Sequence, residues 1–87
     1  MDKIYFLAKI NHINQAFVKF QLYSSCFQAR VAIVNNALRD GYTEKEIYAF
    51  DSEMHGEYET YYAPGNRDVA PMEYHIYPRQ LDQPLGD

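Results

Sequence analysis

The sequence has little of several residue types on which catalysis and secretion depend. Among 87 residues it contains one cysteine, no tryptophan, and four glycines and four prolines. A single cysteine cannot form an intramolecular disulfide, and together with the lack of a signal-peptide pattern it predicts a reducing, cytoplasmic environment. Apolar runs are interrupted well before 18 residues, so we expect no membrane-spanning helix.

The glycines and histidines are also too dispersed for common cofactor sites. No glycine follows a predicted strand and opens a helix, as a phosphate-binding loop requires. Zinc sites usually show paired Cys or His ligands at short spacing, and the chain has no such pair. His55 and His75 could approach each other across strands, with Glu53, Glu57 or Glu73 as oxygen ligands, but the spacing favours solvated histidines. We therefore expect no metal and no cofactor.

Candidate catalytic residues are few. Cys26 would lie in the first turn of a predicted helix, where the helix dipole favours a thiolate. A nucleophile also needs a base and an orienting group, and neither is identifiable, so we interpret Cys26 as a small core residue and His12 as a surface residue. Glu57 and Glu59 would lie about 7 Å apart on one strand face, like a carboxylate pair, but a solvent-facing strand is favoured. The chain is expected not to be an enzyme.

One helix is indicated at both of its ends. Ser25 is a good N-cap with Gln28 three residues later, and Gly41 suits the left-handed residue that ends a helix. Helical periodicity predicts a buried face. Its centre consists of Phe27, Val31, Val34 and Leu38, and Cys26, Ile33 and Ala37 widen it.

Five segments have strand character. Residues 3–10 and 16–23 alternate apolar and polar side chains and should pair as a hairpin, and further strands are expected at 47–53, 57–63 and 73–77. A short helical turn is expected at 43–46, and Met54-His55-Gly56 should form the turn between the third and fourth strands. The helix should cover one face of the hairpin, made of Ile4, Phe6, Ala8, Ile10, Ala16, Val18, Phe20 and Leu22.

The predicted fold is therefore α+β, with one α-helix packed on a mainly antiparallel sheet of four to five strands in the order ββαβββ. Hydrophobic residues make up 47% of the chain and charged residues 23%, which is typical of a folded domain. Residues 1–78 should form this single domain, and residues 79–87 a flexible C-terminal tail.

Charge is distributed unevenly between the two halves of the chain. Residues 1–39 carry a net +4 (five Lys and Arg, one Asp), and residues 40–87 carry a net −8 (three Lys and Arg, eleven Asp and Glu). The acidic half also contains most of the nine tyrosines. Carboxylates steer association with basic surfaces, and tyrosines provide the desolvated contact area. This combination is typical of a protein-binding surface.

The acidic hairpin is accordingly the candidate partner-binding site. Its expected contact residues are Asp51, Glu53, Glu57, Tyr58, Glu59, Tyr61 and Tyr62. They would bind a protein with a basic surface, which in turn could belong to a nucleic-acid-handling complex. An ordinary solvated hairpin is the alternative without function.

A single-stranded nucleic-acid-binding module is the second functional alternative, because aromatic side chains on an exposed sheet can stack on bases. Its platform would consist of Tyr48, Tyr58, Tyr62, Tyr74 and Tyr77. Phosphate affinity depends on Lys and Arg, and these tyrosines lie in the half that carries −8. Direct nucleic-acid binding is therefore not expected.

The layout of the chain resembles that of small phage-encoded inhibitors of the anti-CRISPR and anti-restriction kind. The resemblance lies in the size, the acidic second half, and the hairpin followed by a Ser-capped helix, from Ser24-Ser25 to Ala29-Arg30 and Ala32. It covers most of the chain and is one of layout, not of sequence. It implies a non-catalytic inhibitor that occupies a nucleic-acid-binding surface of a host defence complex in the host cytoplasm.

Two further expectations concern the mode of binding. The net charge of −4 favours an acidic patch that acts locally over imitation of a whole DNA surface. A free edge beside the last strand would allow a homodimer to form by strand addition.

Overall fold

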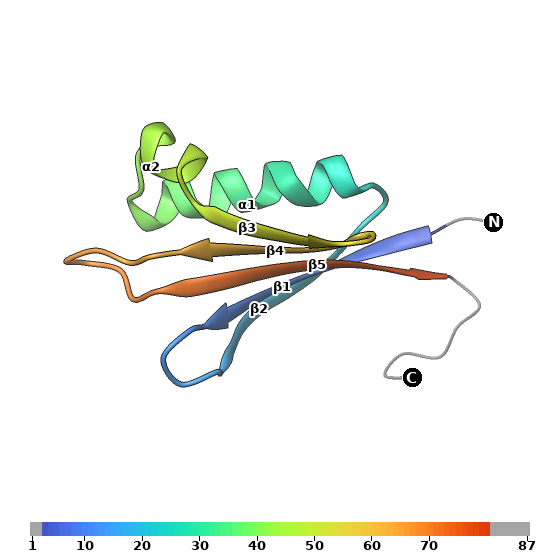
Figure 1. The fold of residues 1–87 in the computed structure, drawn as a ribbon, viewed down its shortest axis with the longest axis horizontal. Coiled ribbons are helices and arrows are strands. Elements are labelled where there is room, and N and C mark those ends of the chain that lie inside the picture. The colour runs from blue at the N-terminus through green and yellow to red at the C-terminus, as the bar shows by residue number, and fades with distance from the viewer. Residues whose placement is uncertain (1–2, 81–87) are drawn as a thin grey trace.

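The computed structural model describes residues 3–80, which form a five-stranded sheet and two helices (Figure 1). The elements in chain order are β1 (Lys3–Asn11), β2 (Phe17–Tyr23), α1 (Cys26–Asp40), α2 (Glu44–Tyr48), β3 (Asp51–His55), β4 (Tyr58–Ala63) and β5 (Met72–Gln80). The prediction of an α+β fold with one main helix and an antiparallel sheet is confirmed. The observed order also contains the short helix α2, between α1 and β3.

The sheet has the strand order β2-β1-β5-β4-β3, and each neighbouring pair is antiparallel. The first and last strands of the chain therefore lie side by side at its centre, in register from Lys3 opposite Gln80 to Asn11 opposite Met72. Strands β2 and β3 form the two edges, so the prediction of a free edge beside the last strand is wrong, because β5 is paired on both sides. The β1–β2 register shifts at Ile10, which faces Phe17, so that Val18 is an extra residue at a bulge.

Helix α1 begins and ends as its sequence predicts. The Ser25 hydroxyl accepts a hydrogen bond from the backbone N–H of Gln28 at 3.1 Å. Gly41 follows the last turn with φ of 112°, a conformation that favours glycine, and its N–H bonds to the carbonyl of Leu38. The two caps satisfy backbone groups that the helix leaves without partners.

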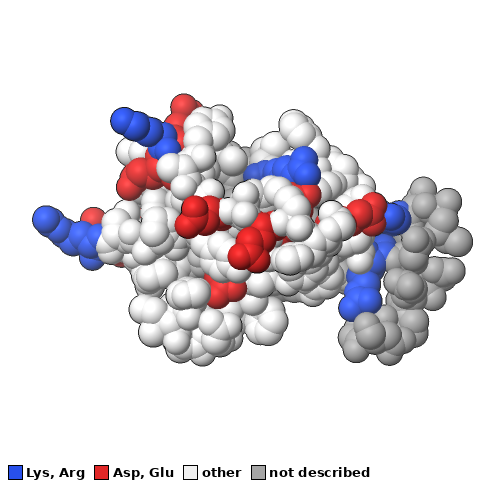
Figure 2. Space-filling model, viewed as in Figure 1, with Lys and Arg blue, Asp and Glu red and all other residues white. Residues whose placement is uncertain are grey.

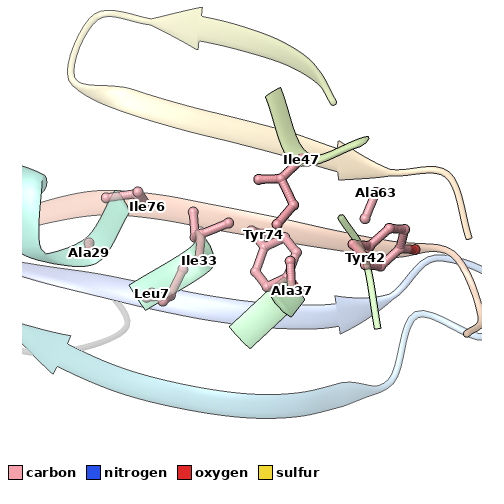
Figure 3. Close-up of a cluster of buried hydrophobic side chains, with 9 residues drawn as sticks. All are labelled: Leu7, Ala29, Ile33, Ala37, Tyr42, Ile47, Ala63, Tyr74 and Ile76. Atoms are coloured by element: carbon pink, nitrogen blue, oxygen red, sulfur yellow. The ribbon is translucent and has the colours of Figure 1, made fainter. Parts of the chain in front are cut away.

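The core is the layer between the helices and one face of the sheet (Figure 3). Its buried members are Leu7, Ala29, Ile33, Ala37, Tyr42, Ile47, Ala63, Tyr74 and Ile76. Tyr74 and Ile76 of β5 are its largest fully buried side chains. The small side chains of Ala29 and Ala37 allow α1 to lie close to the sheet. This close approach permits the dense packing that is typical of protein interiors.

The covered side of the β1–β2 hairpin is opposite to the predicted one. Leu7 lies on the side of the sheet that faces α1, opposite Ile76 of β5. The preceding residue, Phe6, points to the other side of the sheet. Strand β1 is apolar on both sides, and only the pairing with β5 determines which side joins the core. The prediction that α1 covers the following residues is therefore wrong: Ile4, Phe6, Ala8, Ile10, Ala16, Val18, Phe20 and Leu22.

The buried side of α1 also differs from the predicted one. Phe27, predicted at its centre, is 70% exposed, and Val31 and Leu38 are also exposed. Ile33 and Ala37 of the predicted face are buried together with Ala29, and Cys26 and Val34 are partly buried against the core. The buried side of α1 is therefore rotated away from Phe27, Val31 and Leu38 toward Ala29, Ile33 and Ala37.

The predicted boundaries of the third strand need correction at both ends. The third strand does not begin at Ile47, because the capping box of Thr43 and Glu46 starts the helix α2, which buries Ile47. Met54 and His55 belong to β3, and the turn consists of residues 56–57.

The last strand is longer than predicted. Pro78 was expected to end it, but β5 continues to Gln80, with Pro78 opposite Tyr5 of β1. Arg79 and Gln80 of the expected tail are thus part of the sheet, and residues 81–87 lie outside the described residues. Within residues 3–80, neither helix has the length and apolar character needed to cross a membrane.

Candidate interaction surface

The seven residues of the predicted acidic site do not share one surface. They do lie on the β3–β4 hairpin or its turn, but side chains along a strand alternate between the two faces of a sheet. By register Asp51, Glu53, Tyr58 and Tyr62 face away from α1. Glu59 and Tyr61 face α1, and Glu57 lies in the turn.

Glu59 is a buried ion-pair residue. It is 4% exposed, and Arg30 of α1 donates two hydrogen bonds to it, from Nε to Oε1 at 2.8 Å and from a terminal nitrogen to Oε2. The Tyr61 hydroxyl and the Cys26 thiol donate to the same carboxylate, at 2.6 and 3.0 Å. The hydrogen bonds from Arg30, the largest influence, lower the pKa of Glu59 to about 2. Glu59 is therefore neutralised internally and holds α1 to β4.

The same network determines the chemistry of Cys26. Burial, followed by the hydrogen bond to Glu59, raises the pKa of the thiol to about 11. The thiol is therefore protonated at neutral pH despite its position in the first turn of α1. A protonated thiol is a poor nucleophile.

Two exposed carboxylates of the acidic hairpin, those of Asp51 and Glu53, have no Lys or Arg partner within residues 3–80. The Glu53 carboxylate lies 3.4 Å from His55, and the third exposed carboxylate, that of Glu57, pairs with Lys3 at 2.8 Å. Figure 2 shows acidic side chains over the middle of the molecule, in the region of β3 and β4, with most Lys and Arg toward its two ends. The acidic character is thus local and smaller than the sequence predicted.

The open face, as we call it, is the side of the sheet opposite α1 and α2 (Figure 1). No other element covers it in the part of the chain that the structure describes. By register, its residues are Ile4, Phe6, Ala8, Ile10, Phe17, Phe20, Leu22, Asp51, Glu53, His55, Tyr58, Thr60, Tyr62, Glu73, His75, Tyr77 and Arg79. The open face is therefore apolar over β1 and β2 and acidic over β3.

An aromatic row crosses the open face, with one ring from each of four neighbouring strands. The ring centroids of Phe20 and Phe6 lie 5.1 Å apart, those of Phe6 and Tyr77 5.3 Å, and those of Tyr77 and Tyr58 5.8 Å. These separations are typical of attractive aromatic pairs. Phe6 is only 2% exposed as a result, although no helix lies over it.

The apolar end of the open face remains in contact with solvent. Phe17 is 72% exposed, and Phe20 and Leu22 are about half exposed. Single exposed apolar side chains are common, but these three lie on the same face of one edge strand. A depression of about 550 Å³ next to them is lined by Phe17, Ile10 and Tyr77 among others. A contiguous apolar patch with a depression is typical of a docking surface.

A polar network borders the aromatic row. His12 Nδ1 lies 2.6 Å from Glu73 Oε2, and His75 Nε2 lies 2.9 Å from Glu73 Oε1. The other ring nitrogen of His75 contacts the Tyr58 hydroxyl. Burial opposes ionisation of Glu73, but the hydrogen bonds from His75 and His12 outweigh it and lower the pKa of the carboxyl. The network fixes the Tyr58 ring at the end of the row.

The histidines do not form the metal site considered from the sequence. His75 is engaged with Glu73 and Tyr58, whereas His55 is exposed beside Glu53. Residues 3–80 contain no group of three His, Cys, Asp or Glu side chains that could hold a metal ion.

The tyrosine platform considered for nucleic acid is also divided. Tyr58, Tyr62 and Tyr77 lie on the open face, Tyr74 is buried against α1, and Tyr48 is exposed on α2. The aromatic row instead includes Phe6 and Phe20, which the sequence assigned to the core. A signal for this arrangement was present, because β1 is apolar on both sides and one helix can cover only one of them.

Searches of family models, curated proteins and solved structures find no match to this chain.

Proposed function

We propose that the protein is a non-catalytic interaction module that binds another protein through the open face of its sheet. The observation that supports this proposal is the apolar surface of Phe17, Phe20 and Leu22, beside an aromatic row that is already ordered. Ordered aromatic side chains lose little conformational entropy on binding, so they are favourable anchors.

The exposed area is large enough to contribute to affinity. Full burial of a Leu or Phe side chain stabilises by about 1.5–3 kcal/mol, and about half of that remains available for each of the three β2 side chains on the open face. Covering them would contribute roughly 2–4 kcal/mol before the entropy of association is subtracted. The depression beside Phe17 offers a site for one apolar anchor of the partner.

The charges of the open face favour a basic partner. Asp51 and Glu53 are exposed on it, whereas Lys9 of β1 and Lys19 of β2 point to the helix side by register. Within residues 3–80, Arg79 is the one Lys or Arg that the register assigns to the open face. A second copy of the chain would bring few cations to these acids. The partner we propose has an apolar ridge bordered by Lys or Arg.

This proposal retains part of the surface expected from the sequence. Asp51, Glu53, Tyr58 and Tyr62 border the proposed contact, whereas Glu57, Glu59 and Tyr61 are not included. A nucleic-acid-binding surface of a host complex, the partner implied by the resemblance to phage inhibitors, would supply the basic residues. An inhibitor of such a complex is the specific form of the function that we propose.

The test compares two phenylalanines of equal exposure. Phe17 on the open face is 72% exposed, and Phe27 on α1 is 70% exposed. Proteins captured from cells of the source organism by the wild-type chain should be lost with Phe17→Ser and retained with Phe27→Ser. Circular dichroism should show that both variants are folded. Loss with Phe27→Ser and retention with Phe17→Ser would contradict the proposal.

Single-stranded nucleic-acid binding is the second candidate, and the aromatic row is the observation that favours it. The scarcity of cations on the open face opposes it, because phosphate contacts provide most of the affinity. Fluorescence anisotropy with labelled oligo(dT) and oligo(rU) distinguishes the two candidates. Binding that weakens steeply with salt and is lost with Phe20→Ser would favour this candidate over a protein partner.

A further inference from the structure

A cleft of about 310 Å³ lies in the other layer of the molecule, between α1 and the helix side of β2. Polar side chains of β2 and α1 form part of its wall: Lys19, Gln21, Gln28, Asn35 and Arg39. Leu7, Val31 and Ala32 provide an apolar part of the lining. The cleft is separate from the open face, because successive residues of β2 point alternately to the two sides of the sheet.

The cleft follows from the way in which α1 packs. The helix is anchored by Ala29, Ile33 and Ala37 against β1 and β5, at the centre of the sheet, so only its flank lies beside the edge strand β2. The β2 residues that point to this side, Lys19 and Gln21, are long and polar and do not fill the space in the way that apolar core residues would.

The charge in the cleft is positive. No Asp or Glu lines it, whereas Lys9, Lys19 and Arg39 do. Lys9 is 6% exposed and compensated, because its Nζ lies 2.5 Å from Asp40 Oδ2 and 2.6 Å from Asn36 Oδ1. Neither Lys19 nor Arg39 has an ion-pair partner within residues 3–80. Two uncompensated cations therefore border a concave, partly apolar site.

We propose that this cleft binds a small organic anion, whose phosphate or carboxylate group is held by Lys19 and Arg39. Charge-assisted hydrogen bonds from Lys and Arg to such groups are among the stronger polar contacts. The Oε1 atoms of Gln21 and Gln28 accept from the hydroxyls of Tyr23 and Ser24, so their amide N–H groups, with the carboxamide of Asn35, provide the polar contacts for the rest of a ligand.

The size of the cleft limits its ligand. Its volume equals that of about ten water molecules, at the lower end of known ligand pockets. This favours a metabolite-sized anion over a nucleotide or a peptide. The apolar contribution of Val31 and Ala32 favours a ligand with a short hydrocarbon part over an inorganic ion.

The first experiment maps binding on the wild-type chain by ¹⁵N-edited NMR. Inorganic phosphate and succinate serve as the two anionic probes, and succinamide is the uncharged control. We expect saturable shifts concentrated at Lys19, Gln21, Gln28, Asn35 and Arg39, with at least one of the anions and not with succinamide. The more tightly bound anion identifies the preferred anionic group. Shifts that do not saturate, or that are scattered over the surface, would overturn the proposal.

The second experiment removes the charges. The double variant Lys19→Gln/Arg39→Gln should weaken binding of the preferred anion by about tenfold or more, since charge-assisted hydrogen bonds are lost. Lys45→Gln/Arg67→Gln is the matched control, because it also removes two positive charges and both residues are exposed cations that do not line the cleft. Equal weakening by this control would show a response to overall charge alone and would also overturn the proposal. Both results are independent of whether the open face binds a protein.

Discussion

The two faces of this sheet differ in how their side chains are covered. Under α1, small residues such as Ala29 and Ala37 meet the large side chains of Tyr74 and Ile76, and buried charges are paired. On the open face, aromatic rings cover one another, and the apolar residues of β2 remain in solvent. The covered face provides the stability of the fold, and the open face provides an apolar surface that folding does not require. Substitutions should therefore affect stability on one face and binding on the other.

The largest effect on stability should come from the centre of the covered face. Ile76 has no exposed surface, and Ile76→Ala should lower the free energy of unfolding by about 2–5 kcal/mol through lost burial and a residual cavity. Urea denaturation followed by circular dichroism measures this change. A loss below about 1 kcal/mol would indicate that the layer under α1 is not the core.

The buried ion pair should make stability depend on acid. The pKa of Glu59 is about 2 in the folded chain and near its ordinary value of 4.5 in the unfolded chain, so the unfolded state binds the proton more readily. The stabilisation by Glu59 is therefore present above about pH 4.5 and is lost as the pH falls toward 2.

Glu59→Gln tests this dependence. We expect the variant to be less stable at pH 7, by roughly 2 kcal/mol, and to lose less of its stability between pH 5 and pH 2 than the wild-type chain. Thermal unfolding over this pH range is the measurement. Parallel pH profiles for the two proteins would exclude the ion pair as the acid-sensitive element.

The aromatic row should contribute less to stability than the core under α1. Phe20 is about half exposed at the outer end of the row, so Phe20→Ala should cost about 1–2 kcal/mol, partly through the lost contact with Phe6. Urea denaturation again provides the value. A cost equal to that of Ile76→Ala would remove the distinction between the two faces.

The smallest effect is expected at the two most exposed phenylalanines. Phe17→Ser and Phe27→Ser should each change the free energy of unfolding by about 0.5 kcal/mol or less, because neither side chain is packed in the core. Differential scanning fluorimetry should give nearly equal midpoints for both variants and the wild-type chain. If Phe17→Ser alone were strongly destabilising, β2 would have to be regarded as part of the core.

The sequence was sufficient for the parts of the fold that depend on neighbouring residues. Ser25 and Gly41 predicted the ends of α1, and the alternation of residues 3–10 predicted β1, because capping and strand pattern are local properties. The capping box of Thr43 and Glu46 was also predicted, although α2 proved long enough to include Ile47, which had been assigned to a strand.

The choice of the covered face could not be predicted in the same way. Phe6 and Leu7 are both apolar, and the pairing of β1 with β5, far away in the sequence, places Leu7 beside Ile76 under the helix. For α1, the periodicity favoured the side with Phe27 because it weighs large apolar residues most. The close packing of helix and sheet selected the side with Ala29 instead.

The candidate site was affected by the same limitation. Asp51, Glu53, Glu57 and Glu59 are close in the sequence, but the burial of Glu59 depends on Arg30, which lies 29 residues earlier in the chain. A buried ion pair between distant segments has no local signature. The sequence therefore showed that the second half of the chain is acidic, but it overestimated how many of these carboxylates lie on one exposed surface.

Side-chain footprinting of the complex with a captured partner tests the central claim most directly, because hydroxyl radicals label the two faces of the molecule independently. We expect partner binding to protect Phe17, Phe20 and Leu22 from labelling and to leave Phe27 and Tyr48 as reactive as in the free chain. Protection of Phe27 and Tyr48, with Phe17 and Phe20 still labelled, would contradict it.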